Sequence, residues 1–178
     1  MIKIENLYKY FENKKVLNGL NLDIEEGTSS VIIGGSGTGK SVLIKCILGL
    51  LTPNKGRISI KNDLIFENGK FKNKSKIKIG MLFQGGALFD SLKIWQNVSF
   101  YNIQNGKNKK FCYEDAILNL EKVGLSKDIV NLYPSELSGG MQKRVALARA
   151  ISIKPDIIFF DEPTTGLDPI SADVINKL

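Results

Sequence analysis

Apolar and polar residues alternate along the first part of the chain, and this alternation predicts β-strands. Apolar residues recur at every second position at Ile2 and Ile4, and again at Leu20, Leu22 and Ile24. A period of two gathers such residues on one face of a half-buried strand. We therefore predict short strands within the first 35 residues.

A continuous apolar run and a second alternating stretch predict further strands. Val31-Ile32-Ile33 is apolar throughout, which is typical of a buried strand. Residues 57–66 alternate as in a hairpin, with Asn62-Asp63 at the turn. Residues 77–83 and 156–160 are two more strand candidates, and the second of them is short and apolar.

Helical spacing appears in two other parts of the chain. A helix is predicted over about residues 39–50, because Ile44, Ile47 and Leu48 fall on one helical face. Residues 94–153 also have a helical pattern, and the breaks in it are Gly106, Gly124 and Pro134.

The order of these elements indicates a fold class. Strands are followed by a helix, more strands, a helical insert, a strand and a further helix. This order predicts an α/β core with an antiparallel β part and an inserted α-helical lobe at about residues 85–153. The length of 178 residues fits one domain, 1–178.

The composition excludes several kinds of chemistry. With 43% hydrophobic and 24% charged residues, the chain has the material for a packed core. It contains no histidine, which excludes a histidine-ligated zinc site and a Ser-His-Asp hydrolase. Cys46 and Cys112 form no CxxC motif and suit a reducing cytoplasm. The first five residues are unlike a signal peptide, and apolar stretches such as 46–51 are too short to span a bilayer. We expect a cytoplasmic protein.

The net charge of +7 admits two interpretations. A basic chain can bind nucleic acid or an anionic membrane. However, lysines outnumber arginines by 22 to 3, and specific base readers depend on arginine. The bias extends over the whole chain and favours an AT-rich genome as its origin, so we expect no specific nucleic-acid partner. Residues 70–78 carry lysine at every second position, which favours an exposed strand edge or loop over a lipid-binding patch.

A glycine-rich segment is the first motif that carries chemistry. Gly34-Gly35-Ser36-Gly37-Thr38-Gly39-Lys40-Ser41 matches the Walker A phosphate loop, between a predicted strand and a predicted helix. Its glycines let backbone N–H groups surround phosphate oxygens, and the helix N-terminus adds positive charge. Lys40 is expected to reach the β- and γ-phosphates, and Ser41 to ligate Mg²⁺.

A pair of acidic residues follows the last predicted strand. Ile157-Ile158-Phe159-Phe160-Asp161-Glu162 is an apolar run with two carboxylates at its end. Asp161 is expected to hold Mg²⁺ through water, as a Walker B aspartate does. Glu162 is expected to orient or deprotonate an attacking water.

A third segment predicts a second helix N-terminus that can bind an anion. In Leu137-Ser138-Gly139-Gly140-Met141-Gln142-Lys143-Arg144, Ser138 is a good N-cap for the helix formers that follow. An ordinary capped helix is the alternative interpretation.

Together these segments resemble the nucleotide-binding subunit of an ABC transporter, with 137–141 as its signature motif, over essentially the whole chain. The resemblance implies the P-loop fold of ABC ATPases, with ATP and Mg²⁺ as ligands and hydrolysis coupled to transport. Residues 81–92, 134–141 and 161–169 further resemble the Mla/Mkl-type subfamily. Those ATPases power lipid movement together with a permease and a periplasmic lipid-binding (MCE) protein.

The resemblance also implies roles for single residues. Gln84 matches the Q-loop glutamine, which contacts Mg²⁺ or the water and senses the permease. Phe11 matches the aromatic residue that stacks on adenine, with Tyr10 as the alternative, and Asp168 matches the D-loop aspartate of the dimer interface. Two subunits of the family pair head to tail. Residues 138–140 of one subunit therefore cap the γ-phosphate held by the Walker A loop of the other.

An apolar segment after Gln84 corresponds to the place where the family docks its permease. Ala87-Leu88-Phe89, with Leu92, Ile94 and Trp95, would form either that interface or the core of the helical lobe. The resemblance implies a peripheral position on the cytoplasmic face of the inner membrane.

The chain departs from the family pattern in one respect. The family carries a switch histidine on a strand after the catalytic glutamate, whereas this sequence has no histidine and ends at Leu178. We expect the chain to lack the last core strands, to leave strand edges unpaired, and by itself to bind ATP but hydrolyse it slowly. A fragment or early-terminated gene, a separate chain carrying the remainder, and a degenerate ATP binder are the three explanations.

Other functions remain as alternatives. The chain could be an ATP-binding remnant without turnover, or an ABC ATPase for another cargo, since cargo is recognised by the permease. A soluble ABC protein of translation or DNA repair is disfavoured, because such proteins usually carry two ATPase halves or a long coiled-coil insertion.

Overall fold

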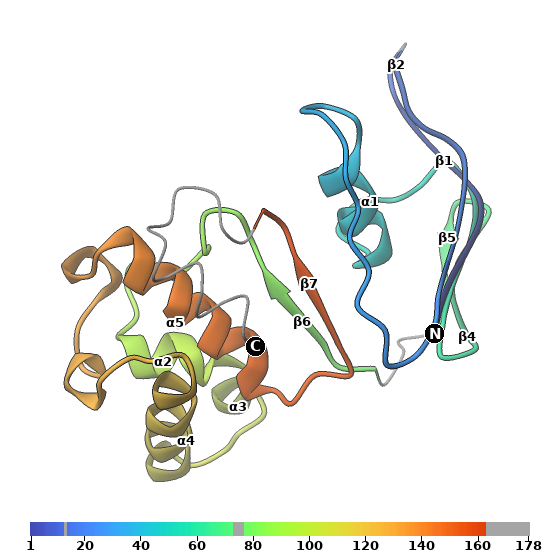
Figure 1. Ribbon diagram of the computed structural model, residues 1–178. Helices are drawn as coiled ribbons and strands as arrows, with labels where there is room; N and C mark the ends of the chain where they lie inside the picture. Colours follow the sequence, from blue (N-terminus) through green and yellow to red (C-terminus); the bar gives the residue numbers. More distant parts are fainter. Residues whose placement is uncertain (13, 73–76, 163–178) are drawn as a thin grey trace. The chain divides into compact units, whose positions relative to one another are not determined.

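The computed structural model describes residues 1–12, 14–72 and 77–162, and the chain divides into two compact units, Met1–Ile77 and Lys78–Leu178 (Figure 1). In chain order the first unit contains β1 (Ile2–Phe11), β2 (Lys14–Ile24), α1 (Lys40–Ile47), β3 (Lys55–Ile60), β4 (Asp63–Glu67) and β5 (Lys70–Phe71). The second contains β6 (Ile79–Leu82), α2 (Ile94–Val98), α3 (Phe100–Gln104), α4 (Lys109–Lys122), the 3-10 helices η1 (Lys127–Ile129) and η2 (Pro134–Glu136), α5 (Gly139–Ser152) and β7 (Ile157–Phe160).

The first unit is built on an antiparallel sheet with strand order β2-β1-β3-β4-β5. Ile4 of β1 lies opposite Leu22 of β2 and Ile58 of β3, so the alternating apolar positions of neighbouring strands align. Ile4, Ile58 and Phe66 are fully buried as a result. The predicted alternation of strands is confirmed, because the period-two pattern puts one side of each strand into the core.

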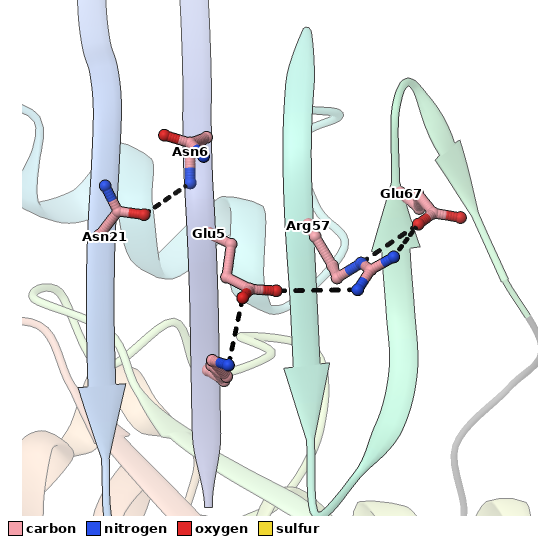
Figure 2. Close-up of polar contacts among 6 residues, drawn as sticks. Glu5, Asn6, Asn21, Arg57 and Glu67 are labelled. Carbon is pink, nitrogen blue, oxygen red and sulfur yellow. Dashed lines mark hydrogen bonds and ion pairs between the residues drawn. The ribbon is translucent and has the colours of Figure 1, made fainter.

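A row of opposite charges crosses three strands of the same sheet (Figure 2). Glu5 of β1 is paired with Arg57 of β3, and Arg57 with Glu67 of β4. The Arg57 guanidinium donates to Glu67 Oε1 at 2.6 Å and lies 3.8 Å from Glu5 Oε2. Lys3 and Lys72 extend the row at its two ends, at 3.1 Å from Glu5 and 3.6 Å from Glu67. These exposed cross-strand pairs favour the observed register.

The hairpin predicted over 57–66 is present, but its turn lies one residue earlier than predicted. Lys61 and Asn62 form the turn with φ values of 49° and 67°. Two consecutive positive φ angles are those of a type I′ turn, whose twist matches the flanking strands. Asp63 instead pairs with Ile60 as the first residue of β4, so Asn62-Asp63 was the wrong pair.

The strand predicted at Val31-Ile32-Ile33 is wrong for this structure. The segment has no regular secondary structure, and Val31 and Ile33 are 83% and 91% exposed. A strand requires a neighbour to accept and donate its backbone hydrogen bonds. Within the described part of the first unit, the paired strands are those of the sheet above, and this segment pairs with none of them.

The second unit is a helical lobe attached to a pair of parallel strands. β6 and β7 pair with Ile79 opposite Ile157 and Leu82 opposite Phe160, as the predictions of strands at 77–83 and 156–160 require. Helices α2, α4 and α5 bury a common core, and fully buried members of it are Leu82, Ile94, Val98, Leu120, Val145 and Leu147. Ile94 and Trp95, the alternative core residues of the sequence analysis, are in this core.

The helix boundaries follow the local signals in the sequence. The helix predicted over 39–50 is α1, which ends before Gly49 because that glycine adopts a left-handed φ of 73°. Gly106 and Gly124 also have positive φ and separate the predicted helices. No helix of the described residues is long and apolar enough to cross a membrane.

Candidate nucleotide site

The phosphate loop leads directly into α1, whose N-terminus carries no competing anion. Gly39 is the N-cap with φ 104°, no side chain caps the helix, and the first turn contains no acidic residue. A Cβ on Gly39 would lie 3.0 Å from Val16 Cγ1 and 3.2 Å from the Val16 carbonyl oxygen. Only glycine suits this conformation in this space, and a helix N-terminus without a side-chain cap or an acidic residue is a typical binding place for phosphate oxygens.

Lys40 folds back over the loop that precedes it. Its Nζ donates to the carbonyl oxygens of Gly34 at 2.6 Å and Gly35 at 2.8 Å. The Thr38 hydroxyl also donates to the Gly35 carbonyl, at 2.9 Å. The loop is therefore closed by its own side chains, and the ammonium group is held at the position where phosphate oxygens would replace the carbonyls as acceptors.

The second unit brings Gln84 and Glu162 together. Gln84 follows β6 and Glu162 follows β7, and parallel strands present their carboxyl ends at the same edge. Gln84 Nε2 donates to Glu162 Oε2 at 2.7 Å, between residues 78 positions apart. The Asp161 N–H donates to the Leu82 carbonyl at 2.9 Å, which extends the backbone hydrogen bonds between β6 and β7 to the residue before Glu162. Glu162 itself has a left-handed φ of 49°, which a non-glycine residue adopts at a cost.

The helix predicted after Ser138 is α5, and its cap is as expected. The Ser138 hydroxyl accepts from the Met141 N–H at 3.3 Å, and Ser138 has extended backbone angles. Gln142 Nε2 donates to the carbonyls of Pro134 and Leu137 and fixes the segment before the helix. A Cβ on Gly139 would meet nothing within 4 Å, so this helix N-terminus is open.

The remaining predicted residues have mixed outcomes. Phe11 ends β1 and is 43% exposed, and Lys9 Nζ lies 5.0 Å from its ring centroid. Asp168 lies outside the described residues. Sequence reasoning did not single out Lys9, nor Asn97, a fully buried amide that bonds both the N–H and the carbonyl of Phe89. The signal for Asn97 was its place beside Val98 and within one helical turn of the apolar residues Ile94 and Trp95.

Each unit by itself carries oxygen donors of the kind that Mg²⁺ prefers. Ser41 begins α1 after the phosphate loop, Asp161 follows β7, and Gln84 is committed to Glu162. Among the residues that the structure describes, no group of three or more acidic, cysteine or histidine side chains could hold a metal by itself. Mg²⁺ keeps several waters and takes phosphate oxygens as further ligands, so it needs few protein donors, and the predicted ligands Ser41, Asp161 and Gln84 stay a prediction.

Comparison with known proteins decides the family. The sequence model of the ABC transporter family matches residues 17–165. The chain belongs to the ABC transporter family. Its fold is that of an ABC ATPase, and ATP with Mg²⁺ is the ligand pair that this family binds. An ABC cassette solved as a dimer in a post-hydrolysis state bound to ADP and Pi has a TM-score of 0.88 and 31% identity, over 99% of this chain and 80% of that one.

Relatives in this family carry different cargo names. Protein TRIGALACTOSYLDIACYLGLYCEROL 3, chloroplastic, of Arabidopsis thaliana is 40% identical over 100% of this chain and 54% of its own length. The probable ribonucleotide transport ATP-binding protein mkl of Mycobacterium leprae is 40% identical over 99% and 51%. The glutamate transport ATP-binding protein GluA of Corynebacterium efficiens is 41% identical over 100% and 72%. The chain spans about half the length of the first two relatives.

Proposed function

We propose that this chain is an ATP-hydrolysing subunit that energises a membrane permease. The hydrogen bond between Gln84 Nε2 and Glu162 Oε2, at 2.7 Å, carries the proposal. It joins the predicted Q-loop glutamine to the predicted catalytic carboxylate at one sheet edge. Membership of the ABC transporter family supports the same function.

Different residues of the chain would bind the phosphates, the metal ion and the adenine ring of ATP. Lys40 and the N–H groups of the first turn of α1 bind the β- and γ-phosphates of ATP. Ser41, Asp161 and Gln84 are the side chains that would hold Mg²⁺, which neutralises phosphate charge when bound. Phe11 offers an exposed aromatic face for the adenine ring.

Glu162 acts as general base in this proposal. Gln84 donates to Glu162 Oε2 and so orients the carboxylate, which would accept a proton from a water. The water oxygen bonds to the γ-phosphorus as its proton passes to Glu162. The bond from the γ-phosphorus to the oxygen it shares with the β-phosphate breaks, and ADP and phosphate result.

A second copy of the chain, or another ABC ATPase subunit, would complete the site. Ser138, Gly139 and Gly140 at the open N-terminus of α5 would cap the γ-phosphate held by the partner's loop, and Asp168 would lie at that interface. The dimeric state of the similar ABC cassette supports this arrangement. We propose a peripheral position on the cytoplasmic face of the inner membrane for the assembly.

The test compares the Mg²⁺-ATPase rate of the chain with that of Glu162→Gln over a range of protein concentrations. We expect the wild-type rate to rise more than linearly with concentration, and the variant to lose at least about 100-fold in rate while still binding a fluorescent ATP analogue. Glu121→Gln on the exposed side of α4 is the matched control and should keep the rate. Equal rates in wild type and Glu162→Gln would reduce the chain to an ATP-binding fragment or remnant.

Phospholipid is our finer proposal for the cargo. The resemblance of residues 81–92, 134–141 and 161–169 to Mla/Mkl-type ATPases supports it, and a relative named for a glycolipid supports a lipid cargo in general. An MCE-type lipid-binding protein would then be a third component. The glutamate-transport relative supports an amino-acid cargo instead. ATPase stimulation of the chain with its co-purified permease by phospholipid, and not by amino acids, is the expected result.

A further inference from the structure

The segment after β6 holds Gln84 in a turn that has an unusual backbone. The Gly86 N–H donates to the Phe83 carbonyl at 2.8 Å and closes the turn around Gln84. Gly86 has φ 73°, and Ala87 follows with φ 49°. Two successive left-handed residues, one of them an alanine, persist only where surrounding contacts hold them.

Arg149, in the last turn of α5, supplies such contacts. Its Nη2 donates to the Gly86 carbonyl at 2.7 Å, and its Nη1 donates to the Ala87 carbonyl at 2.8 Å. The guanidinium carbon also lies 5.9 Å from the centre of the Phe89 ring. One planar fork therefore binds the two left-handed residues and covers the aromatic ring beyond them.

The use of arginine at this position fits the geometry. The chain has 22 lysines and 3 arginines, so an arginine is an uncommon choice of cation in this sequence. A lysine ammonium is a compact charge without the rigid fork that spans two neighbouring carbonyls. Burial lowers the pKa of Arg149 from its ordinary value, yet a guanidinium is basic enough to stay protonated at neutral pH.

A second anchor lies further from Gln84. Asn97 bonds the N–H of Phe89 at 2.8 Å and the carbonyls of Phe89 and Leu92 at 3.0 Å. It fixes the far end of the segment, whereas Arg149 fixes the part that follows Gln84 directly. Arg149 thus hydrogen-bonds the Gln84 turn to α5, at the part of the segment that directly follows Gln84.

We propose that Arg149 is a positioning residue for ATP hydrolysis. It binds the carbonyls of Gly86 and Ala87 and so keeps Gln84 on Glu162. This inference rests on the proposed function. Because Ser138 caps the same helix at its other end, α5 joins the signature motif to the pair Gln84 and Glu162.

The first experiment is a double-mutant cycle on the full chain. Arg149→Lys should lower kcat about tenfold and leave KM for ATP within about twofold, because the variant loses a charge-assisted fork and no ATP contact. Gln84→Ala combined with Arg149→Lys should be no slower than Gln84→Ala alone, since both changes act through one side chain. Arg144→Lys is the matched control. Arg144 lies on the same helix and donates to the Gly124 carbonyl at 3.1 Å, away from the Gln84 turn, so its kcat should stay unchanged.

Hydrogen exchange gives a readout that does not depend on turnover. The amides of residues 83–89 should exchange faster in Arg149→Lys than in wild type, while those of α4 stay protected; Arg144→Lys should leave 83–89 unchanged. Unchanged exchange at 83–89 in Arg149→Lys would overturn the inference. The inference would also be overturned if the fold-losses of kcat in Gln84→Ala and Arg149→Lys multiplied in the double variant. That result would leave the proposed function intact. A wild-type chain without Glu162-dependent hydrolysis would overturn the proposed function, and this inference with it.

Discussion

Single residues near the nucleotide site differ in how much local strain they carry. Ala87 and Glu162 have left-handed φ values of 49°. Lys61 and Asn62 also have positive φ angles, but they lie in a hairpin turn where this conformation is normal. Glu162 instead follows strand β7, and its carboxylate accepts a hydrogen bond from Gln84. This hydrogen bond fixes the orientation of the Glu162 side chain.

Cys46 lies on the buried side of α1, and burial raises the pKa of its thiol to about 11. The unfolded thiol has an ordinary pKa of about 8.5, so above that pH the unfolded chain loses a proton that the folded chain keeps. The free energy of unfolding should therefore fall as the pH rises from about 8.5 towards 11. Urea denaturation of wild type and Cys46→Ala over this range measures it, and the variant should show a shallower decline. Parallel curves for the two proteins would contradict the expectation.

At the scale of elements, the charge row across β1, β3 and β4 should make the sheet sensitive to acid (Figure 2). The hydrogen bond from Arg57 lowers the pKa of Glu67, with the charges of Arg57 and Lys72 adding to it. Stability from this group is present above the unfolded pKa of about 4.3 and is lost as the pH falls through the lowered folded value. Glu67→Gln should show a smaller acid loss in denaturation curves, whereas the exposed Glu26→Gln should follow wild type.

The contact between β6 and α5 should tolerate no added carbon at Gly80. A Cβ there would lie 2.7 Å from the Ala150 carbonyl oxygen and 3.3 Å from Pro155 Cγ. Since the helix backbone cannot give way cheaply, Gly80→Ala should cost about 2 kcal/mol or more of unfolding free energy. Gly85→Ala is the control, because its Cβ would meet nothing within 4 Å and its change should stay within about 0.5 kcal/mol. Thermal and urea unfolding of both variants provide the comparison.

At the scale of the whole molecule, the proposed dimer predicts an effect of charge at Ser138. Aspartate and asparagine both cap helices well, but only aspartate adds a negative charge at the N-terminus of α5. In a Glu162→Gln background, with Mg²⁺ and ATP present, Ser138→Asp should remain monomeric because the carboxylate repels the partner's γ-phosphate. Ser138→Asn should still dimerise. Size-exclusion chromatography with light scattering distinguishes the two, and equal dimerisation would speak against a γ-phosphate at this helix.

The sequence was most informative where structure depends on neighbours along the chain. Alternation predicted the antiparallel strands, glycines marked the ends of helices, and Ser138 marked the start of α5, because each of these rests on local sterics or on a cap within one turn. The predicted hairpin turn, Asn62-Asp63, is one position later than the observed turn, Lys61-Asn62. Both pairs contain residues common in turns, so the local sequence does not decide between them. The apolar run at Val31-Ile32-Ile33 pairs with no strand of the described residues, and no local pattern reveals whether a partner strand exists.

The motifs by themselves indicated the family through the combination of a phosphate loop, carboxylates after an apolar run and a signature segment in one chain, and the match of the family model confirmed it. Tertiary structure alone decided which side chains meet. Gln84 reaches Glu162 because β6 and β7 pair in parallel across 78 positions, and Arg149 reaches the turn after Gln84 because α5 packs beside β6. A periodic pattern records which face of an element is buried, whereas the partner on that face depends on how distant elements pack.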